Sequence, residues 1–318
     1  MKFRLVWISV LVLSLICIGI LASVWSASSE LLFPVWRNAS KNWSVCDPET
    51  EKHWGKGCGN LLQTREFRFE EGTFPSLNGY ELPGWFVRTA ENGGGKPQGV
   101  ILFVHGGGSD RREMTRYVRF FLDLNLDVLS VDLSCHGQAP CVMPGLTYGE
   151  RESRDVISIY LYLSRKYSKV YALGSSVGAS SILTAIPEMP ELSGVIAENP
   201  MFDFRRLILE TSSAPKFIPE WFKKFLLEVS MVRGKFDGIS SPANSLRMPG
   251  KIPVFFIHSK EDKIVPYRHT EELATLYKGP KTVWLLEKGE HGSVWEKNPN
   301  EYRNRVRNFL QRKSPSGN

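Results

Sequence analysis

The sequence predicts an α/β fold with a mostly parallel central sheet and helices on both of its faces. Short, continuous apolar runs recur along the chain, as expected of strands that are buried on both faces. Helix-length segments separate these runs, which is the spacing of right-handed crossovers between parallel strands. The runs lie at residues 100–104, 128–131, 170–173, 194–197, 253–257 and 282–286.

Length and composition agree with this fold class. The chain has 318 residues, of which 42% are hydrophobic and 23% charged, and this suits one large globular domain with a sizeable core. We place that domain at residues 63–313. Within it, residues 65–70 and 80–88 are expected to form an opening hairpin, and residues 149–167 a long helix.

A longer insertion is expected at about residues 200–250, between two of the strands. It contains an amphipathic helix whose apolar residues are spaced i, i+3, i+4, i+7, i+8 and i+11, with Lys223 and Lys224 on the other face. Two interpretations stay open: a small helical cap over an acyl pocket, close to lipid headgroups, or an ordinary crossover helix packed on the sheet. The apolar residues are Ile218, Trp221, Phe222, Phe225, Leu226 and Val229.

Residues 1–27 are predicted to be a signal anchor that spans a membrane. The apolar run Leu5–Trp25 has 21 residues, which suits a membrane-spanning helix. Lys2 and Arg4 precede it, so the N-terminus is expected on the cytoplasmic side and the domain on the extracytoplasmic side. The alternative is a cleaved signal peptide and a secreted domain. Residues 28–62 show no clear period and are expected to be a juxtamembrane connector.

The cysteines fit an exported domain. Four of the five follow the apolar run, and four cysteines allow three disulfide connectivities. We favour the local pairs Cys46–Cys58 and Cys135–Cys141, because they need the least chain rearrangement, in an oxidising compartment. No cysteine or histidine pair has metal-ligand spacing, so we expect neither a metal nor another cofactor.

The net charge of +7 is mild and scattered. Its densest basic stretch, residues 303–313, reads as an amphipathic C-terminal helix with a solvated basic face. No nucleic-acid motif accompanies it, so no nucleic-acid partner is expected. The sequence leaves the oligomeric state open.

The strongest chemical signal is the segment Gly174-Ser175-Ser176-Val177-Gly178, which follows an apolar run. A strand, a sharp turn and a helix start would hold a serine on a strained elbow with its hydroxyl exposed. Glycine on both sides lets the backbone approach closely. Ser176 has glycine two residues before and after it, whereas Ser175 has Leu173 and Val177. The candidate nucleophile is therefore Ser176.

Another reactive loop follows the strand at residues 100–104. His105-Gly106-Gly107-Gly108-Ser109-Asp110 carries three glycines whose N–H groups can point at a ligand. Together with the N–H of Val177 they could hold an oxyanion, with Gly107 favoured over Gly108 as the donor. The alternative is a tight strand-to-helix turn without a binding role.

The last two strands are followed by an acid and a histidine. Asp262 comes after the strand at 253–257, and His291 after the strand at 282–286. A loop histidine can take a serine proton when a carboxylate holds its tautomer. The order Ser176, Asp262, His291 is the one that this arrangement predicts. Glu261 and Glu198 are alternative acids.

These segments together resemble the α/β-hydrolase superfamily, over roughly residues 64–312. Within it, the sequence is similar to membrane-anchored alpha/beta-hydrolase-domain proteins and to bacterial serine aminopeptidase-like lipases and esterases. The resemblance implies the α/β-hydrolase fold, with Ser176 as nucleophile, His291 as base and Asp262 as the orienting acid. It rests on His105 to Gly108, Asp132 to Gly137, the serine elbow, His258 to Pro266 and His291-Gly292.

One segment departs from that family. The family pattern near residue 132 usually reads Asp-x-Arg-Gly-His-Gly-x-Ser, whereas Ser134, Cys135 and Ala139 stand here in place of the arginine, the glycine after it and the serine. This loop is expected to flank the pocket, so the departure bears on the shape of the substrate.

The predicted function is that of a serine hydrolase that cleaves a carboxylic ester, with acyl lipids favoured, through an acyl-enzyme. The alternatives are a thioesterase or peptidase of the same fold, and a non-catalytic hydrolase-fold interaction domain. The expected partners are a small-molecule or lipid ester substrate and the membrane that the N-terminal helix spans.

Overall fold

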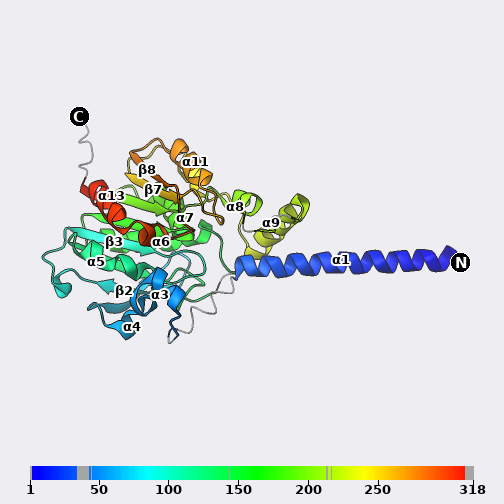
Figure 1. The fold of residues 1–318 in the computed structure, drawn as a ribbon, viewed down its shortest axis with the longest axis horizontal. Coiled ribbons are helices and arrows are strands. Elements are labelled where there is room, and N and C mark those ends of the chain that lie inside the picture. Colours follow the sequence, from blue (N-terminus) through cyan, green and yellow to red (C-terminus); the bar gives the residue numbers. More distant parts are fainter. Residues whose placement is uncertain are drawn as a thin grey trace.

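The computed structural model of the chain contains one eight-stranded sheet with helices on both faces (Figure 1). It describes residues 2–33, 43, 45–142, 144–212, 214–215 and 217–311. The strand order is β1-β2-β4-β3-β5-β6-β7-β8. The strands are β1 (Glu70–Pro75), β2 (Glu81–Val87), β3 (Gly99–Val104), β4 (Leu126–Val131), β5 (Val170–Ser175), β6 (Gly194–Glu198), β7 (Val254–Ser259) and β8 (Lys281–Leu286).

The helices alternate with the strands from β3 onward. The α-helices are α1 (Lys2–Leu32), α3 (Pro48–Trp54), α4 (Leu61–Thr64), α5 (Val118–Leu122), α6 (Glu150–Ser164), α7 (Val177–Ala185), α8 (Phe204–Glu210), α9 (Glu220–Gly234), α10 (Pro242–Ser245), α11 (Arg268–Leu276), α12 (Val294–Lys297) and α13 (Pro299–Gln311). The 3₁₀ helices are η1 (Lys56–Gly59), η2 (Ala90–Asn92), η3 (Glu113–Tyr117) and η4 (Ile186–Glu188).

The sheet is mostly parallel, as predicted. β4, β3, β5, β6, β7 and β8 run parallel to one another, and β1 and β2 join the β4 edge as antiparallel strands. The opening hairpin exists, but its first strand begins at Glu70, so the prediction of residues 65–70 was wrong. Arg65 caps α4 with a left-handed backbone (φ 50°), which turns the chain before a strand can start. Phe67 alternates with polar neighbours because its side chain enters the core.

Alternate residues of each central strand face two different cores. In β3, Val100, Leu102 and Val104 pack on the face that α6 and α7 cover. Ile101 and Phe103 pack on the opposite face, with η3, α5 and α13. Burial on both faces explains why these strands read as continuous apolar runs rather than as an alternating pattern.

Helix α1 continues past residue 27, the predicted end of the anchor, to Leu32. Its last turns lie beside α9 (Figure 1), where Val24, Ser28 and Leu32 are buried at intervals of four residues. Leu32 joins a small core with Phe204, Ile208, Leu227, Met231 and Phe236, all of which follow β6. The end of α1 is therefore packed into the domain.

Hydrogen bonds from the domain to α1 reinforce this packing. Arg233 Nη1 donates to the Trp25 carbonyl (2.7 Å), and Arg233 Nη2 donates to Ser29 Oγ (3.0 Å). Tyr148 Oη donates to the Leu31 carbonyl (3.0 Å). The last four carbonyls of a helix have no partner within it. The Leu31 carbonyl is one of these in α1, so Tyr148 satisfies a group that the helix leaves unpaired.

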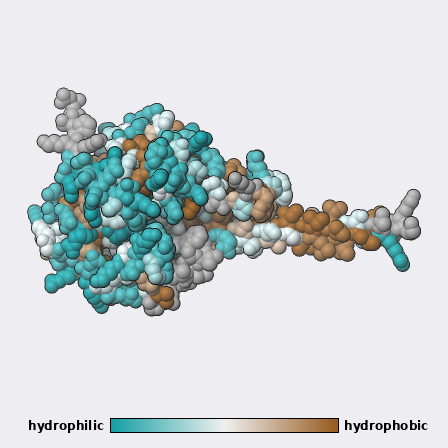
Figure 2. Space-filling view, in the orientation of Figure 1, coloured by the Kyte–Doolittle hydropathy of each residue, from teal (hydrophilic) through white to brown (hydrophobic). Residues whose placement is uncertain are grey.

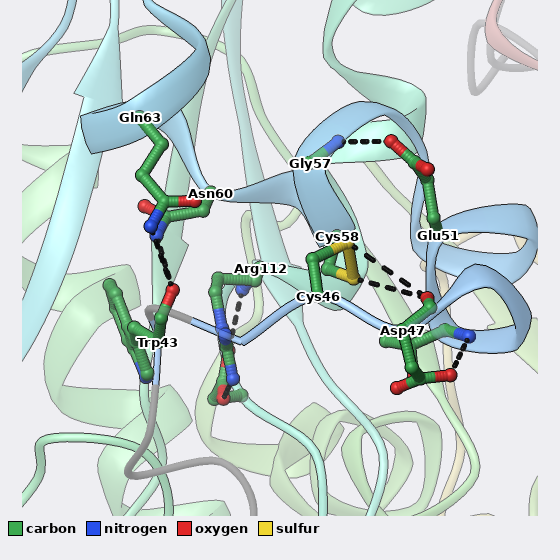
Figure 3. The surroundings of a disulfide bond; sticks show 11 residues. Trp43, Cys46, Asp47, Glu51, Gly57, Cys58, Asn60, Gln63 and Arg112 are labelled. Carbon is green, nitrogen blue, oxygen red and sulfur yellow. Dashed lines mark hydrogen bonds and ion pairs between the residues drawn. A yellow bond between two sulfur atoms is a disulfide. The ribbon is translucent and has the colours of Figure 1, made fainter.

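A disulfide bond closes a loop within residues 45–62, ahead of β1 (Figure 3). Cys46 and Cys58 are bonded, which is one of the two local pairs that the sequence favours; Cys135–Cys141 is the other. Glu51 accepts the Gly57 N–H (2.8 Å) across the same loop. Asn60 Nδ2 donates to the Trp43 carbonyl (3.0 Å), which ties the loop to a residue whose ring meets Trp85 edge to face. Much of the predicted connector thus folds onto the domain.

Replacing Cys46 and Cys58 together by alanine should lower the free energy of unfolding by about 3 kcal/mol, because the unfolded chain regains the freedom of the closed loop. Urea titration of the full chain in detergent, followed by circular dichroism, measures the change. The matched control is Cys17→Ala, which removes the exposed free cysteine of α1. Equal stability of the double variant and the control would show that the bridge contributes nothing.

Candidate active site

Ser176 stands on a sharp turn between β5 and α7. Its backbone is left-handed (φ 51°, ψ −112°), which is strained for a residue with a side chain. A Cβ at Gly174 would lie 2.5 Å from the Ala179 nitrogen, and one at Gly178 would lie 2.1 Å from the Val104 carbonyl. Both glycines are therefore needed for the backbone to pass so close. This is the elbow that the sequence predicts.

The structure also separates the two adjacent serines. Ser175 is the last residue of β5 and is only 2% exposed, whereas Ser176 is partly exposed. The Ser176 N–H donates to the Glu198 carbonyl (2.8 Å) and its carbonyl accepts from Ser180 N (2.9 Å). The backbone of Ser176 is thereby fixed from both sides.

The predicted oxyanion donors lie side by side at this turn. A Cβ at Gly107 would come 2.7 Å from Val177 Cγ2, and a Cβ at Gly106 would come 3.6 Å from Ser176 Cβ. The glycine loop after β3 is thus in contact with the serine elbow. Val177 is the first residue of α7, and the first N–H groups of a helix have no acceptor within it. The N–H of Gly106 is engaged with Glu113 Oε2 (3.0 Å), so it is not available as a donor.

Two buried side chains brace the glycine loop, a role that the sequence did not reveal for Glu113. His105 Nε2 accepts the Leu133 N–H (3.0 Å), so its other nitrogen, Nδ1, carries the proton that it donates to the Gly106 carbonyl (2.7 Å). Burial opposes ionisation of Glu113, but the guanidinium of Arg116 and the hydrogen bond from Ser109 lower the pKa of Glu113 below its usual value. Glu113 therefore holds the loop as a carboxylate.

A further loop connects the glycine loop to α1. The Leu146 N–H donates to the Leu32 carbonyl (2.9 Å), the last residue of α1. The Leu146 side chain reaches the glycine loop, since a Cβ at Gly107 would lie 3.3 Å from Leu146 Cδ2. Arg151 holds the same loop by donating to the Gly145 carbonyl (2.9 Å) and to the Gly234 carbonyl at the end of α9 (2.9 Å).

The predicted acid and histidine meet after β7 and β8. Asp262 Oδ2 lies 2.6 Å from His291 Nδ1. Asp262 Oδ1 accepts the N–H groups of Ile264 and Val265, each at 2.9 Å. Burial would raise the pKa of Asp262, but the hydrogen bonds from His258 and His291 outweigh it and hold the pKa well below the ordinary value. Asp262 is thus a fixed anion beside one nitrogen of His291.

Ser176 and His291 are not hydrogen-bonded to each other in the structure. Ser176 follows β5 and His291 follows β8, at the carboxyl edge of the same parallel set of strands. Hydrogen bonds between such groups are often long without substrate and tighten when it binds. The structure therefore brings together Asp262 with His291, and Ser176 with the glycine loop.

Sequence reasoning missed two partners of Asp262. His258 Nε2 lies 3.1 Å from Asp262 Oδ2 and its Nδ1 lies 2.6 Å from Thr270 Oγ1. Asn199 Nδ2 donates to the same Asp262 oxygen (3.0 Å). The spacing of four residues between His258 and Asp262 is the sequence pattern that could have predicted this contact. For Asn199 no local pattern exists, because it lies 63 residues away in the chain.

The two alternative acids have other partners. Glu261 Oε2 accepts the Gly289 N–H (3.1 Å). Glu198 is fully buried behind the elbow, where Tyr117 Oη donates to its Oε2 (2.9 Å) and Tyr302 Oη donates to its Oε1. Burial raises the pKa of Glu198 to about 7. Of the three carboxylates, Asp262 is the one that contacts His291.

The loop that departs from the family pattern is held in place by other contacts. Asp132 pairs with Arg111 Nη1 (2.5 Å) and accepts the Gln138 N–H (2.8 Å). The Cys135–Cys141 disulfide closes the following turn. Arg111 lies in the loop after β3 and is the cation that pairs with Asp132. In the family pattern, the arginine instead stands two residues after the aspartate.

Two other features do not bear on this site. A surface groove lies at the amino ends of the strands, where Gln98, Lys169 and Lys281 line it, on the opposite edge of the sheet from Ser176. Within the described residues, no group of three or more histidine, cysteine, aspartate or glutamate side chains could hold a metal ion. The candidate site therefore consists of the serine elbow, the glycine loop and the Asp262–His291 pair.

A nucleophile elbow over a parallel sheet, with an acid and a histidine after the later strands, defines the class of α/β hydrolases. Residues 95–248, just under half of the chain, match the family described as serine aminopeptidase, S33. Part of the chain thus matches a family of α/β hydrolases and the whole domain has the α/β-hydrolase fold, which confirms the resemblance seen in the sequence.

Similar proteins agree with this assignment. The chain is 29% identical over 255 residues to YqkD of Bacillus subtilis, an uncharacterized protein, across 76% of this chain and 79% of YqkD. YfhR of Escherichia coli K12, also uncharacterized, is 22% identical over 246 residues, across 76% and 80% of the two chains.

Solved structures share the fold. The esterase Pf2001 of Pyrococcus furiosus superimposes with a TM-score of 0.61 and 21% identity, over 78% of this chain and 91% of the esterase. An acylaminoacyl peptidase of Pyrococcus horikoshii gives a TM-score of 0.59 and 19% identity, over 79% of this chain and 42% of the peptidase. Together with the family match, these neighbours support a serine hydrolase in general.

The raised pKa of Glu198 predicts a pH-dependent stability. Between the ordinary carboxyl range and pH 7 the folded chain keeps a proton on Glu198 that the unfolded chain releases, so stability falls as the pH rises through this window. Glu198→Gln removes this loss. Relative to the variant, the wild type should lose on the order of 2 kcal/mol between pH 5 and pH 8.

Thermal unfolding of both proteins at several pH values measures this difference. The matched control is Glu191→Gln, on the exposed surface, which should follow the wild type at every pH. Parallel curves for the wild type and Glu198→Gln would mean that Glu198 is ionised in the fold.

Proposed function

We propose that the protein is a serine hydrolase that cleaves carboxylic esters with Ser176, His291 and Asp262 as its catalytic triad. The observation that carries the proposal is the left-handed backbone of Ser176 between two close-packed glycines. Strained backbone of this kind persists where the surrounding structure holds it and is concentrated at functional sites. The Asp262–His291 hydrogen bond supplies the base that such a nucleophile needs.

In the first step, His291 Nε2 takes the proton of Ser176 Oγ, which attacks the carbonyl carbon of the ester. Asp262 accepts from His291 Nδ1–H, which keeps Nε2 free to act as the base, and stabilises the imidazolium that forms. The N–H groups of Gly107 and Val177 bind the oxyanion. When the intermediate collapses, the alcohol leaves with the proton from His291 and the acyl group stays on Ser176.

In the second step, water repeats this sequence on the acyl-enzyme. His291 removes a proton from the water, whose oxygen attacks the acyl carbon, and the same two N–H groups hold the oxyanion. Ser176 regains its proton from His291 and the carboxylic acid leaves. No metal or other cofactor takes part in the proposed reaction.

Among substrates, carboxylic esters rank first and acyl lipids are favoured, because an apolar helix and an aromatic cap helix adjoin the domain. Thioesters and peptides are the alternatives, and peptide cleavage is the activity named for the similar acylaminoacyl peptidase. A non-catalytic interaction domain is the rival class; an intact set of Ser176, Asp262 and His291 argues against it.

We also propose that α1 remains attached as a membrane anchor, with the domain on the extracytoplasmic side. By length and composition α1 could cross a membrane, and a signal peptide would pass the same test. The contacts of Val24 and Trp25 with the domain favour the anchor, because cleavage near residue 27 would remove the buried Val24 side chain and the Trp25 carbonyl to which Arg233 donates. The two disulfides support an extracytoplasmic domain.

Hydrolysis of p-nitrophenyl esters of increasing chain length by the purified full chain tests the proposed chemistry. Ser176→Ala should lower kcat by about 10⁴-fold or more, because the nucleophile is lost. Ser175→Ala is the matched control, one residue away and buried in β5, and should stay within about tenfold of the wild type. Loss of activity in Ser175→Ala alone, with Ser176→Ala active, would contradict the assignment. No activity on esters, with turnover of thioesters or aminoacyl amides, would select an alternative substrate.

A further inference from the structure

The cap helix α9 presents an apolar surface that the domain does not cover. Its buried residues are Leu227, Ser230, Met231 and Gly234, on the side that faces α1 and α8. The aromatic residues that the sequence predicts as an apolar stripe point elsewhere. We call the exposed apolar set the α9 outer face: Phe217, just before the helix, is 85% exposed, Trp221 55%, Phe225 37% and Val232 78%.

The position of α1 relative to this surface is fixed. The Arg233 guanidinium lies 3.6 Å from the Trp25 ring centre and donates to the Trp25 carbonyl. A charged group is costly within the hydrocarbon of a bilayer, so the hydrocarbon must end at or before Trp25. At the N-terminal end of α1, the charge of Arg4 likewise keeps that residue outside the hydrocarbon. The 20 residues between them span about 30 Å as a helix, which equals the thickness of the hydrocarbon layer.

This register brings α9 to the membrane surface. Helix α9 is the part of the domain that lies along α1, and it projects from the domain toward the N-terminal end of α1 (Figure 1). Val24 is buried against the domain while Leu21 and Trp25 are exposed, so the packed domain begins where the span ends. Figure 2 shows the hydrophobic rod of α1 leaving a largely hydrophilic domain surface at this point.

We propose that the α9 outer face lies in the headgroup layer of the bilayer that α1 crosses. The inference rests on the proposed anchoring of α1. Tryptophan and other aromatic rings favour this layer. The charges beside them suit it as well, because they are paired: Lys224 with Glu220 (2.7 Å) and Glu228 with Arg205 (2.8 Å). Continuity with the exposed apolar surface of α1 favours lipid over a protein as the occupant.

This placement has a consequence for the substrate. Ser212, in the segment between α8 and α9, donates from its N–H (3.2 Å) and its Oγ (3.0 Å) to the carbonyl of Lys263, the neighbour of Asp262. The edge of the sheet that carries the triad is therefore linked to the surface that touches lipid. An ester dissolved in the bilayer would reach Ser176 along the cap without first entering bulk water.

Fluorescence quenching by brominated lipid tests the proposal on the full chain, reconstituted in phosphatidylcholine nanodiscs with or without bromine on the acyl chains. The emission of Trp221 is the difference between the wild type and Trp221→Phe. Because bromine quenches only on close approach, roughly half or more of this emission should be lost in brominated lipid, as expected for an indole at the membrane interface. The matched control is Trp284→Phe, which reports on a buried tryptophan of β8 and should show no bromine effect.

Equal emission of Trp221 in both lipids would overturn the proposal, whether water or a second copy of the chain covers the α9 outer face; chemical crosslinking tells those two cases apart. Intact mass verifies that residues 1–32 are present. Quenching does not involve Ser176, so absence of quenching in an active enzyme overturns this inference alone. Quenching in a protein without esterase activity would leave the inference standing and remove the proposed function.

Discussion

The close approach of α7 to the end of β3 is the constraint on which the candidate site depends. Gly178 passes so near the Val104 carbonyl that a single Cβ would lie 2.1 Å from it. This contact forces Ser176 into its left-handed conformation, and it sets Val177 against Gly107. The nucleophile and the proposed oxyanion donors are thus placed by backbone packing. A small side chain at one position would displace all of them together, because the core has no room to relax.

The parts of the site that could be predicted from the sequence are those that lie in short, contiguous sequence motifs. The elbow, the glycine loop, Asp262 and His291 each follow an apolar strand, and parallel strands bring their carboxyl ends to one edge of the sheet. Asn199 and His258, which also bond to Asp262, were not predicted as its partners, because their roles arise only when separate loops meet. The first strand was misplaced for a local reason: the alternation around Phe67 reflects core packing after a left-handed turn at Arg65.

The relation of α1 to the cap lay beyond sequence reasoning. Arg233 and Trp25 are 208 residues apart in the sequence, and neither lies in a motif that predicts their contact. The apolar pattern of α9 was read correctly as amphipathic, yet the residues that it buries are Leu227, Ser230 and Met231 rather than the aromatic stripe. Leu146 then connects the end of α1 to Gly107. Helix α1, helix α9 and the glycine loop form one continuous packed unit, which ties the proposed chemistry to the proposed membrane anchor.

The central claim is that Ser176 is the activated nucleophile, and covalent labelling tests it most directly. The full chain is treated with a fluorophosphonate, which phosphonylates a serine hydroxyl that a neighbouring base activates. Peptide mass spectrometry then locates the adduct on the fragment that contains both serines of the elbow. The account predicts one phosphonyl group, on Ser176, in the native protein and none after unfolding in urea before labelling. An adduct on Ser175 or elsewhere, or a native protein that stays unlabelled, would contradict it.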